Sequence, residues 1–146
     1  MVSIVRQEHL KVKSQLDLVG QVQLWFGNIC QSVDEDYDWI HYYTDRLALA
    51  LTEGFTNAVR HAHAHLSPET PISIDVALDN NHVEIRILDQ GHPFNPELLP
   101  EPQPGALVDG GYGWFLLRRL ADQVSYQRLR DGRNCLIIVK YASCLV

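Results

Sequence analysis

Two alternating runs in the middle of the chain constrain its fold more than any other feature. Residues 72–78 and 83–87 carry an apolar side chain at every second position, and Asn80-Asn81 lies between them. A period of two is typical of strands with one buried face, and asparagines tolerate the positive φ of a tight turn. The sequence therefore predicts an antiparallel hairpin.

A second hairpin is predicted near the end of the sequence. Residues 124–129 and 134–140 flank Asp131-Gly132. This dipeptide strongly favours the tight turn that joins the two strands of a hairpin. Residues 9–13 also alternate, and the lysines in this short run suit an edge strand that resists pairing with other chains. Five strands are expected in all.

Three segments have the periodicity of helices with one apolar face. Apolar residues recur at three- and four-residue steps over about 16–31 and over about 44–65, and a glycine-led helix is expected over about 113–121. A proline-rich loop at about 93–108 has the length of a functional lid. This order favours an α+β fold, a two-layer α/β sandwich with a mixed, mostly antiparallel sheet and helices on one face.

Composition limits the classes of function. The chain has 146 residues, 46% of them apolar, which suits a single domain over 1–146 with a sizeable core. Its 12 basic and 18 acidic residues give a net charge of −6, which argues against direct binding to nucleic acid.

The cysteines and apolar runs predict the compartment. Cys30, Cys135 and Cys144 are odd in number and far apart, so we expect free thiols rather than a disulfide framework. The longest apolar run, 135–139, is too short to span a membrane, and no signal peptide is evident. A cytoplasmic protein that does not enter a membrane is expected.

The first cluster of candidate functional residues lies on the second predicted helix. At about 100° per residue, Glu53, Asn57 and His61 share a face away from the apolar stripe, and Ala50 and Gly54 flank this face. Such small residues let a ligand lie close to the helix. The alternative is an ordinary solvated face.

The second cluster ends the strand 83–87. Alternation turns Asp89 toward the apolar face, where an unpaired carboxylate costs several kcal/mol and therefore needs donors. A base with an exocyclic amine would supply one. The alternative is an aspartate that only starts a turn before Gly91.

The third cluster is the glycine-rich opening of the last helix, from Gly110 to Gly113. Backbone amides at such a helix start attract phosphate. The segment is not a P-loop, because no lysine and serine or threonine follow it. It is not a dinucleotide fingerprint either, because Leu116 stands where that motif needs its last glycine. A loop that merely ends at a helix is the alternative.

Together the three clusters resemble the nucleotide-binding boxes of the GHKL ATPase superfamily. Residues 53–61 resemble an E-x-x-x-N-A-x-x-H motif, 89–94 a D-x-G-x-x-F box, and 111–117 a G-x-G-x-x-L box. The branch most similar is the anti-sigma factor serine/threonine kinases of bacteria. The resemblance runs from the first strand to Lys140.

The resemblance implies a histidine-kinase-like ATPase fold, ATP and Mg²⁺. Asn57 would hold the metal, Glu53 would be the catalytic base, and Asp89 would read the adenine amine in a pocket shaped by Gly91. The rest of the nucleotide-binding set would be His61, Phe94, Gly111, Gly113 and Leu116. In some relatives a threonine on the last strands helps to hold adenine, and Asn134 is the nearest candidate here.

The implied function is that of a partner-switching regulator. The chain would sequester a sigma factor and phosphorylate a serine or threonine of an anti-sigma-factor antagonist protein, and dimers occur in the family, so a homodimer is one expectation. A catalytically weak nucleotide-binding module that only sequesters its partner is the alternative. Zinc held by His61 and His65 is a further alternative, for which the sequence identifies no other ligand.

Overall fold

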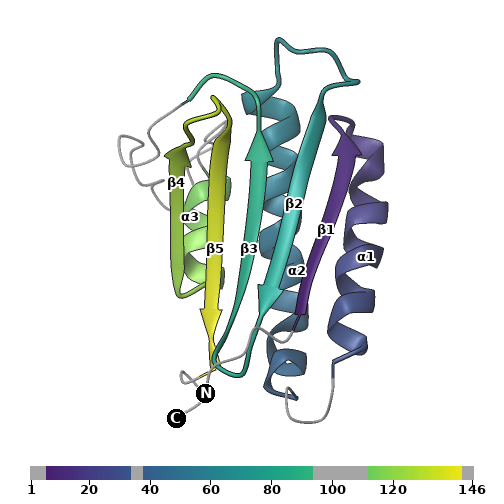
Figure 1. The fold of residues 1–146 in the computed structure, drawn as a ribbon, viewed down its shortest axis with the longest axis vertical. Helices are drawn as coiled ribbons and strands as arrows, with labels where there is room; N and C mark the ends of the chain where they lie inside the picture. Colours follow the sequence, from purple (N-terminus) through teal and green to yellow (C-terminus); the bar gives the residue numbers. More distant parts are fainter. Residues whose placement is uncertain (1–5, 34–37, 94–111, 143–146) are drawn as a thin grey trace.

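The computed structural model describes residues 6–33, 38–93 and 112–142, which form a sheet with helices on one face (Figure 1). The strands are β1 (Arg6–Lys13), β2 (Pro71–Leu78), β3 (His82–Asp89), β4 (Gln123–Arg128) and β5 (Asn134–Tyr141). The helical segments are η1 (Leu16–Leu18), α1 (Val19–Gln31), α2 (Trp39–Asn57), η3 (Ala58–Ala62) and α3 (Tyr112–Leu120). The predicted lid falls mostly outside the described residues.

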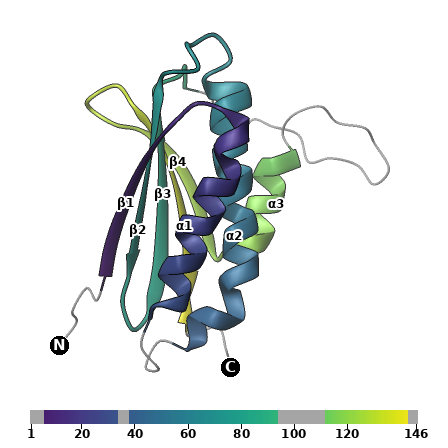
Figure 2. The ribbon, with the colours of Figure 1, turned by 90° about the vertical axis from the view of Figure 1, so that its right-hand side faces the viewer.

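The strand order β1-β2-β3-β5-β4 puts β3 at the centre of the sheet and the predicted edge strand β1 at one edge. Each of the four described pairings is antiparallel, whereas the sequence left a mixed sheet open. Figure 2 shows α1, α2 and α3 on the same side of the sheet. The predicted α+β sandwich is therefore confirmed, and Asp89, the last residue of β3, lies opposite Asn134 of β5.

The two hairpin turns are closed in different ways. Gly132 has a φ of 89°, as the Asp-Gly signal predicts. Among the described residues, no residue other than glycine has a positive φ. Asn80 and Asn81 therefore do not use the positive φ that asparagine tolerates in a tight turn. Instead, the Asp79 carboxylate accepts hydrogen bonds from the backbone N–H groups of Asn81 (2.7 Å) and His82 (2.9 Å). A side chain closes this turn.

The second predicted helix, 44–65, needs correction at both ends. Helix α2 begins earlier, at Trp39, and the α-helical hydrogen bonds end at Asn57. A π-helical turn, η3, follows, in which the His63 N–H donates to the Ala58 carbonyl at 2.8 Å. Its residue types are equally compatible with an α-helix, so periodicity could not reveal it. The first predicted helix likewise divides into η1 and α1, and the first strand begins at Arg6 rather than His9.

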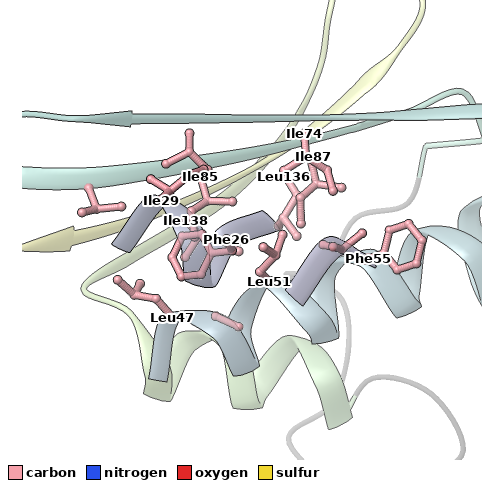
Figure 3. Close-up of a cluster of buried hydrophobic side chains, with 14 of the residues drawn as sticks. Phe26, Ile29, Leu47, Leu51, Phe55, Ile74, Ile85, Ile87, Leu136 and Ile138 are labelled. Atoms are coloured by element: carbon pink, nitrogen blue, oxygen red, sulfur yellow. The ribbon is translucent and has the colours of Figure 1, made fainter. Parts of the chain in front are cut away.

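The core lies between the helices and the inner face of the sheet (Figure 3). Helix α2 contributes Leu47, Leu51 and Phe55, all fully buried, and α1 contributes Phe26. The sheet contributes alternate residues of its central strands, which include Ile74, Ile85, Ile87, Leu136 and Ile138. This packing fixes the position of α2 over β3, and thereby the site described below. Within the described ranges, no helix has both the length and the apolar character needed to cross a membrane.

Leu51→Ala tests the core. Leu51 is 0% exposed and Leu49 is 43% exposed on the same helix. We expect Leu51→Ala to lower the free energy of unfolding by about 2–5 kcal/mol, because it leaves a cavity. Leu49→Ala, the matched control, should change it by less than about 0.5 kcal/mol. Urea denaturation measures both values, and similar losses for the two variants would contradict this account of the core.

Candidate functional site

The start of α3 lies directly against the polar face of α2. A Cβ atom built on Gly113 would lie 2.8 Å from Nδ2 of Asn57 and 3.0 Å from Oε2 of Glu53. A larger residue here would have to displace the ends of these two side chains. The first backbone N–H groups of a helix lack partners within the helix, and here they adjoin a carboxylate and an amide. The arrangement can bind a phosphate group and a hard cation together.

Asp89 is buried, with 3% of its surface exposed, and it meets three donors. Its Oδ1 atom accepts hydrogen bonds from the Gly91 N–H (2.9 Å) and from Nδ2 of Asn134 (2.8 Å). Its Oδ2 atom accepts a hydrogen bond from the Tyr126 hydroxyl at 3.2 Å. Asp89 therefore points inward, as predicted, and its carboxylate has the hydrogen-bond donors that a buried charge needs.

Asn134 connects Asp89 to the loop that follows it. Besides its bond to Asp89, Nδ2 of Asn134 donates to the Gly91 carbonyl at 2.9 Å, and the Asn134 side chain is 0% exposed. The guanidinium of Arg128 donates to the Gly91 carbonyl and to Oδ1 of Asn134, both at 3.2 Å. These bonds hold the Gly91 backbone and the Asp89 carboxylate in one rigid group.

The π-helical turn η3 packs against the same loop. A Cβ on Gly91 would lie 1.9 Å from the Ala62 carbonyl oxygen, a distance that no side chain can occupy. Nearby, Nε2 of His63 accepts a hydrogen bond from the Gln90 N–H at 2.8 Å. The chain just after the first motif, at Ala62 and His63, is therefore in direct contact with the start of the second motif, at Gln90 and Gly91.

His63 is the residue that this contact depends on most. Its side chain is buried, and burial lowers its pKa, although the neighbouring Asp89 carboxylate opposes this shift. Because Nε2 accepts a hydrogen bond from the Gln90 N–H, it carries no hydrogen, and the ring is neutral with its hydrogen on Nδ1. That Nδ1 atom is buried and has no partner among the described residues.

A small cavity joins the two halves of the site. It has a volume of about 30 Å³. Its walls come from the end of α2 and η3, from α3, and from β3, β4 and β5: Gly54, Asn57, Ala58, Ala62, Ile87, Asp89, Trp114, Leu117, Tyr126 and Leu136. Its lining combines a few polar groups, those of Asn57, Asp89 and Tyr126, with apolar side chains, a combination that is typical of ligand sites.

The structure brings some of the sequence-predicted residues together and separates others. Glu53, Asn57 and Gly113 form one end of the site, and Asp89 and Gly91 form the other. His61, in the π-helical turn, is exposed and does not line the cavity. Leu116 is half-buried, and its neighbour Leu117 lines the cavity instead. Phe94 and Gly111 lie outside the described residues.

Sequence reasoning missed three residues of the site: His63, Tyr126 and Arg128. For Tyr126 a signal existed, because it follows Val124 by two positions and so shares its inward face. For His63 there was none, since its orientation depends on the π-helical turn.

The donor set fits ATP with Mg²⁺. Asp89 offers an acceptor to an amine, and the indole N–H of Trp114 in the cavity wall is buried without a partner among the described residues. Asn57, beside the start of α3, offers an amide oxygen of the kind that Mg²⁺ accepts as a ligand. In the described part of the chain, no three histidine, cysteine or acidic side chains gather as metal ligands, so phosphate oxygens would have to complete the coordination.

Comparison with known proteins identifies the family. Residues 12–140 match the histidine kinase-like ATPase domain. The chain belongs to this family. The serine-protein kinase RsbW of Oceanobacillus iheyensis is 30% identical over 123 residues, which are 79% of this chain and 75% of that protein. RsbW of Bacillus subtilis is 27% identical over 126 residues, which are 81% of this chain and 76% of that protein.

A solved structure agrees with this assignment. The RsbU and RsbW domains of a Mycobacterium tuberculosis protein match 93% of this chain and 32% of that chain, with a TM-score of 0.63 and 13% identity. At this identity the likeness shows the fold alone. The resemblance to the anti-sigma factor serine/threonine kinases is confirmed by the family match and the RsbW relatives. Membership of this ATPase family implies the use of ATP.

Gly91→Ala tests the contact between η3 and the Asp89 loop. The added methyl group would collide with the Ala62 carbonyl, so we expect a loss of about 1–3 kcal/mol in the free energy of unfolding. The control is Gly27→Ala in α1, where a Cβ meets nothing within 4 Å. That variant should gain up to about 1 kcal/mol through helix propensity. Denaturation curves decide, and a Gly91 variant as stable as the Gly27 variant would contradict the close approach.

The pH dependence of stability tests His63. Because burial lowers its pKa from 6.5 in the fold, the unfolded chain binds a proton more readily. The contribution of His63 is therefore present above about pH 6.5 and is lost as the pH falls through the lowered pKa. We expect a shallower loss of stability between neutral and acidic pH in His63→Gln than in the original protein. His65→Gln, at an exposed position, should keep the original slope, and equal slopes in all three proteins would contradict the assignment.

Proposed function

We propose that this chain binds ATP with Mg²⁺ and transfers the γ-phosphoryl group to a serine or threonine hydroxyl of a partner protein. The observation that carries the proposal is the juxtaposition of Glu53 and Asn57 with the start of α3, across the cavity from the buried Asp89. One end has the chemistry to read a base and the other end has the chemistry to hold phosphates.

The base would enter the cavity with its exocyclic amine toward Asp89. The rigid group formed by Asp89, Gly91 and Asn134 fixes the position of the acceptor. The apolar side chains of Ile87 and Leu136, which are paired neighbours on β3 and β5, would cover one face of the base. An acceptor held in place in this way selects an amine without the cost of ordering the carboxylate.

At the other end, Glu53 would act as the general base. Its carboxylate lies one helical turn before Asn57 and beside the Gly113 backbone, from which it can accept the proton of an attacking hydroxyl. The Asn57 amide would hold the metal, and the α3 amides would orient the phosphates. When bound, Mg²⁺ neutralises the charge that develops on the transferred group.

The partners proposed are those of a partner switch. In its ATP-bound form the chain would sequester a sigma factor, and it would phosphorylate an anti-sigma-factor antagonist, which then no longer relieves the inhibition. The RsbW relatives named serine-protein kinases support this proposal. A pull-down of the purified chain with candidate sigma factors and antagonists, with and without ATP, would identify both partners.

Glu53→Gln tests the catalytic step. We expect label transfer from γ-labelled ATP to the antagonist to fall by at least about 10²-fold, as for the loss of a general base, while ATP affinity stays within about threefold. Glu69→Gln is the control, because Glu69 is exposed, is paired with Lys13 at 2.8 Å and does not line the cavity. Unchanged transfer in Glu53→Gln would exclude Glu53 as the base. ATP binding without transfer in the original protein would leave only the sequestering module.

A further inference from the structure

Tyr126 occupies a position in the candidate site that no motif assigns. It lies on β4, an edge strand, directly opposite Leu136 of β5, and its side chain is half-buried in the cavity wall. Its hydroxyl is the donor to Oδ2 of Asp89. Tyr126 therefore contacts the acceptor that the proposed function gives to the adenine amine.

The two oxygens of Asp89 are engaged unequally. Oδ1 already accepts two hydrogen bonds, at 2.8 and 2.9 Å, from Asn134 and from Gly91, and these donors belong to the rigid group. Among the described residues, the donor to Oδ2 is Tyr126, at 3.2 Å. Hydroxyl donors usually lie about 2.5–3.0 Å from their acceptor, so this bond is long and weak. Oδ2 is the oxygen at which a donor can be exchanged.

The chemistry of Tyr126 makes it a constant donor. Burial and the nearby Asp89 carboxylate raise the pKa of its hydroxyl, so the group keeps its proton at neutral pH. A buried carboxylate oxygen left without a donor is costly, so Tyr126 satisfies Oδ2 as long as no other donor is present.

The size of the cavity points to the same residue. At about 30 Å³ it has room for about one water molecule, whereas ligand pockets usually measure about 300–1,000 Å³. A fused purine ring system cannot enter unless a wall moves. Tyr126 is a half-buried wall residue on an edge strand that is paired on one side only, so its side chain can turn outward without breaking the sheet.

We propose that Tyr126 is a specificity-determining gate, whose ring closes the cavity and whose hydroxyl holds Oδ2 of Asp89 until a base with an amino group replaces it. The inference rests on the proposed function, in which Asp89 accepts a hydrogen bond from adenine. An amino group at position 6 of a purine exchanges one donor for another. An oxo group there presents an acceptor to the carboxylate and leaves Oδ2 unsatisfied, so it does not displace Tyr126.

Tyr126→Phe separates the hydroxyl from the ring. The variant keeps the wall but has no donor to compete with the amine, so we expect the dissociation constant of ATP, measured by titration calorimetry, to fall by about three- to tenfold. Inosine triphosphate, with an oxo group at position 6, should show no gain. Unchanged or weaker ATP binding would overturn the proposal, and so would an equal gain for both nucleotides.

Two further variants make the result interpretable. Tyr141→Phe is the matched control, because the Tyr141 hydroxyl donates to Gln123 at 3.1 Å and is not part of the cavity wall, and its ATP affinity should stay unchanged. Denaturation of each variant verifies that it is folded. Asp89→Asn tests the proposed function separately. If it leaves ATP affinity unchanged, the proposed adenine site is wrong; if it abolishes binding but Tyr126→Phe gives no gain, only the gate is wrong.

Discussion

A carboxylate buried at the end of the central strand is the constraint around which the site is organised. Asp89 lies on the inner face of the sheet, where desolvation without partners would cost several kcal/mol. The fold meets this cost by pairing β3 with β5, which brings Asn134 opposite Asp89, and by turning the chain at Gly91. The same donors fix the acceptor in a single orientation. The contacts that satisfy the buried charge therefore also build the proposed base-reading site.

Much of the fold followed from local pattern. The alternation in 72–78 and 83–87 predicted the central hairpin, and continuing that alternation to Asp89 predicted a buried carboxylate in need of donors. These inferences succeeded because alternate side chains of a strand point to opposite faces of the sheet, so the apolar residues identify which face is buried. The hairpin turn at Asn80-Asn81 was predicted correctly, but its positive φ was not found, because the Asp79 side chain closes the turn.

The rest of the site depends on contacts that local pattern does not encode. The π-helical turn places His63 against the Asp89 loop, yet its sequence, AVRHA, is equally suited to an α-helix. Two of the donors to Asp89, Tyr126 and Asn134, lie on strands 37 and 45 residues further along the chain, and their positions depend on hairpin register. π-helical turns often occur at functional sites, and here the turn connects the metal-binding and base-reading ends of the proposed site.

The central claim is that ATP binds with its adenine at Asp89 and its phosphates at the start of α3. A crystal structure of the protein with a non-hydrolysable ATP analogue and Mg²⁺ tests this most directly. The account predicts the adenine amine within hydrogen-bonding distance of Oδ2 of Asp89, Tyr126 displaced from that oxygen, and the metal beside Asn57. A nucleotide bound elsewhere, with the hydrogen bond between Tyr126 and Asp89 intact, would contradict it.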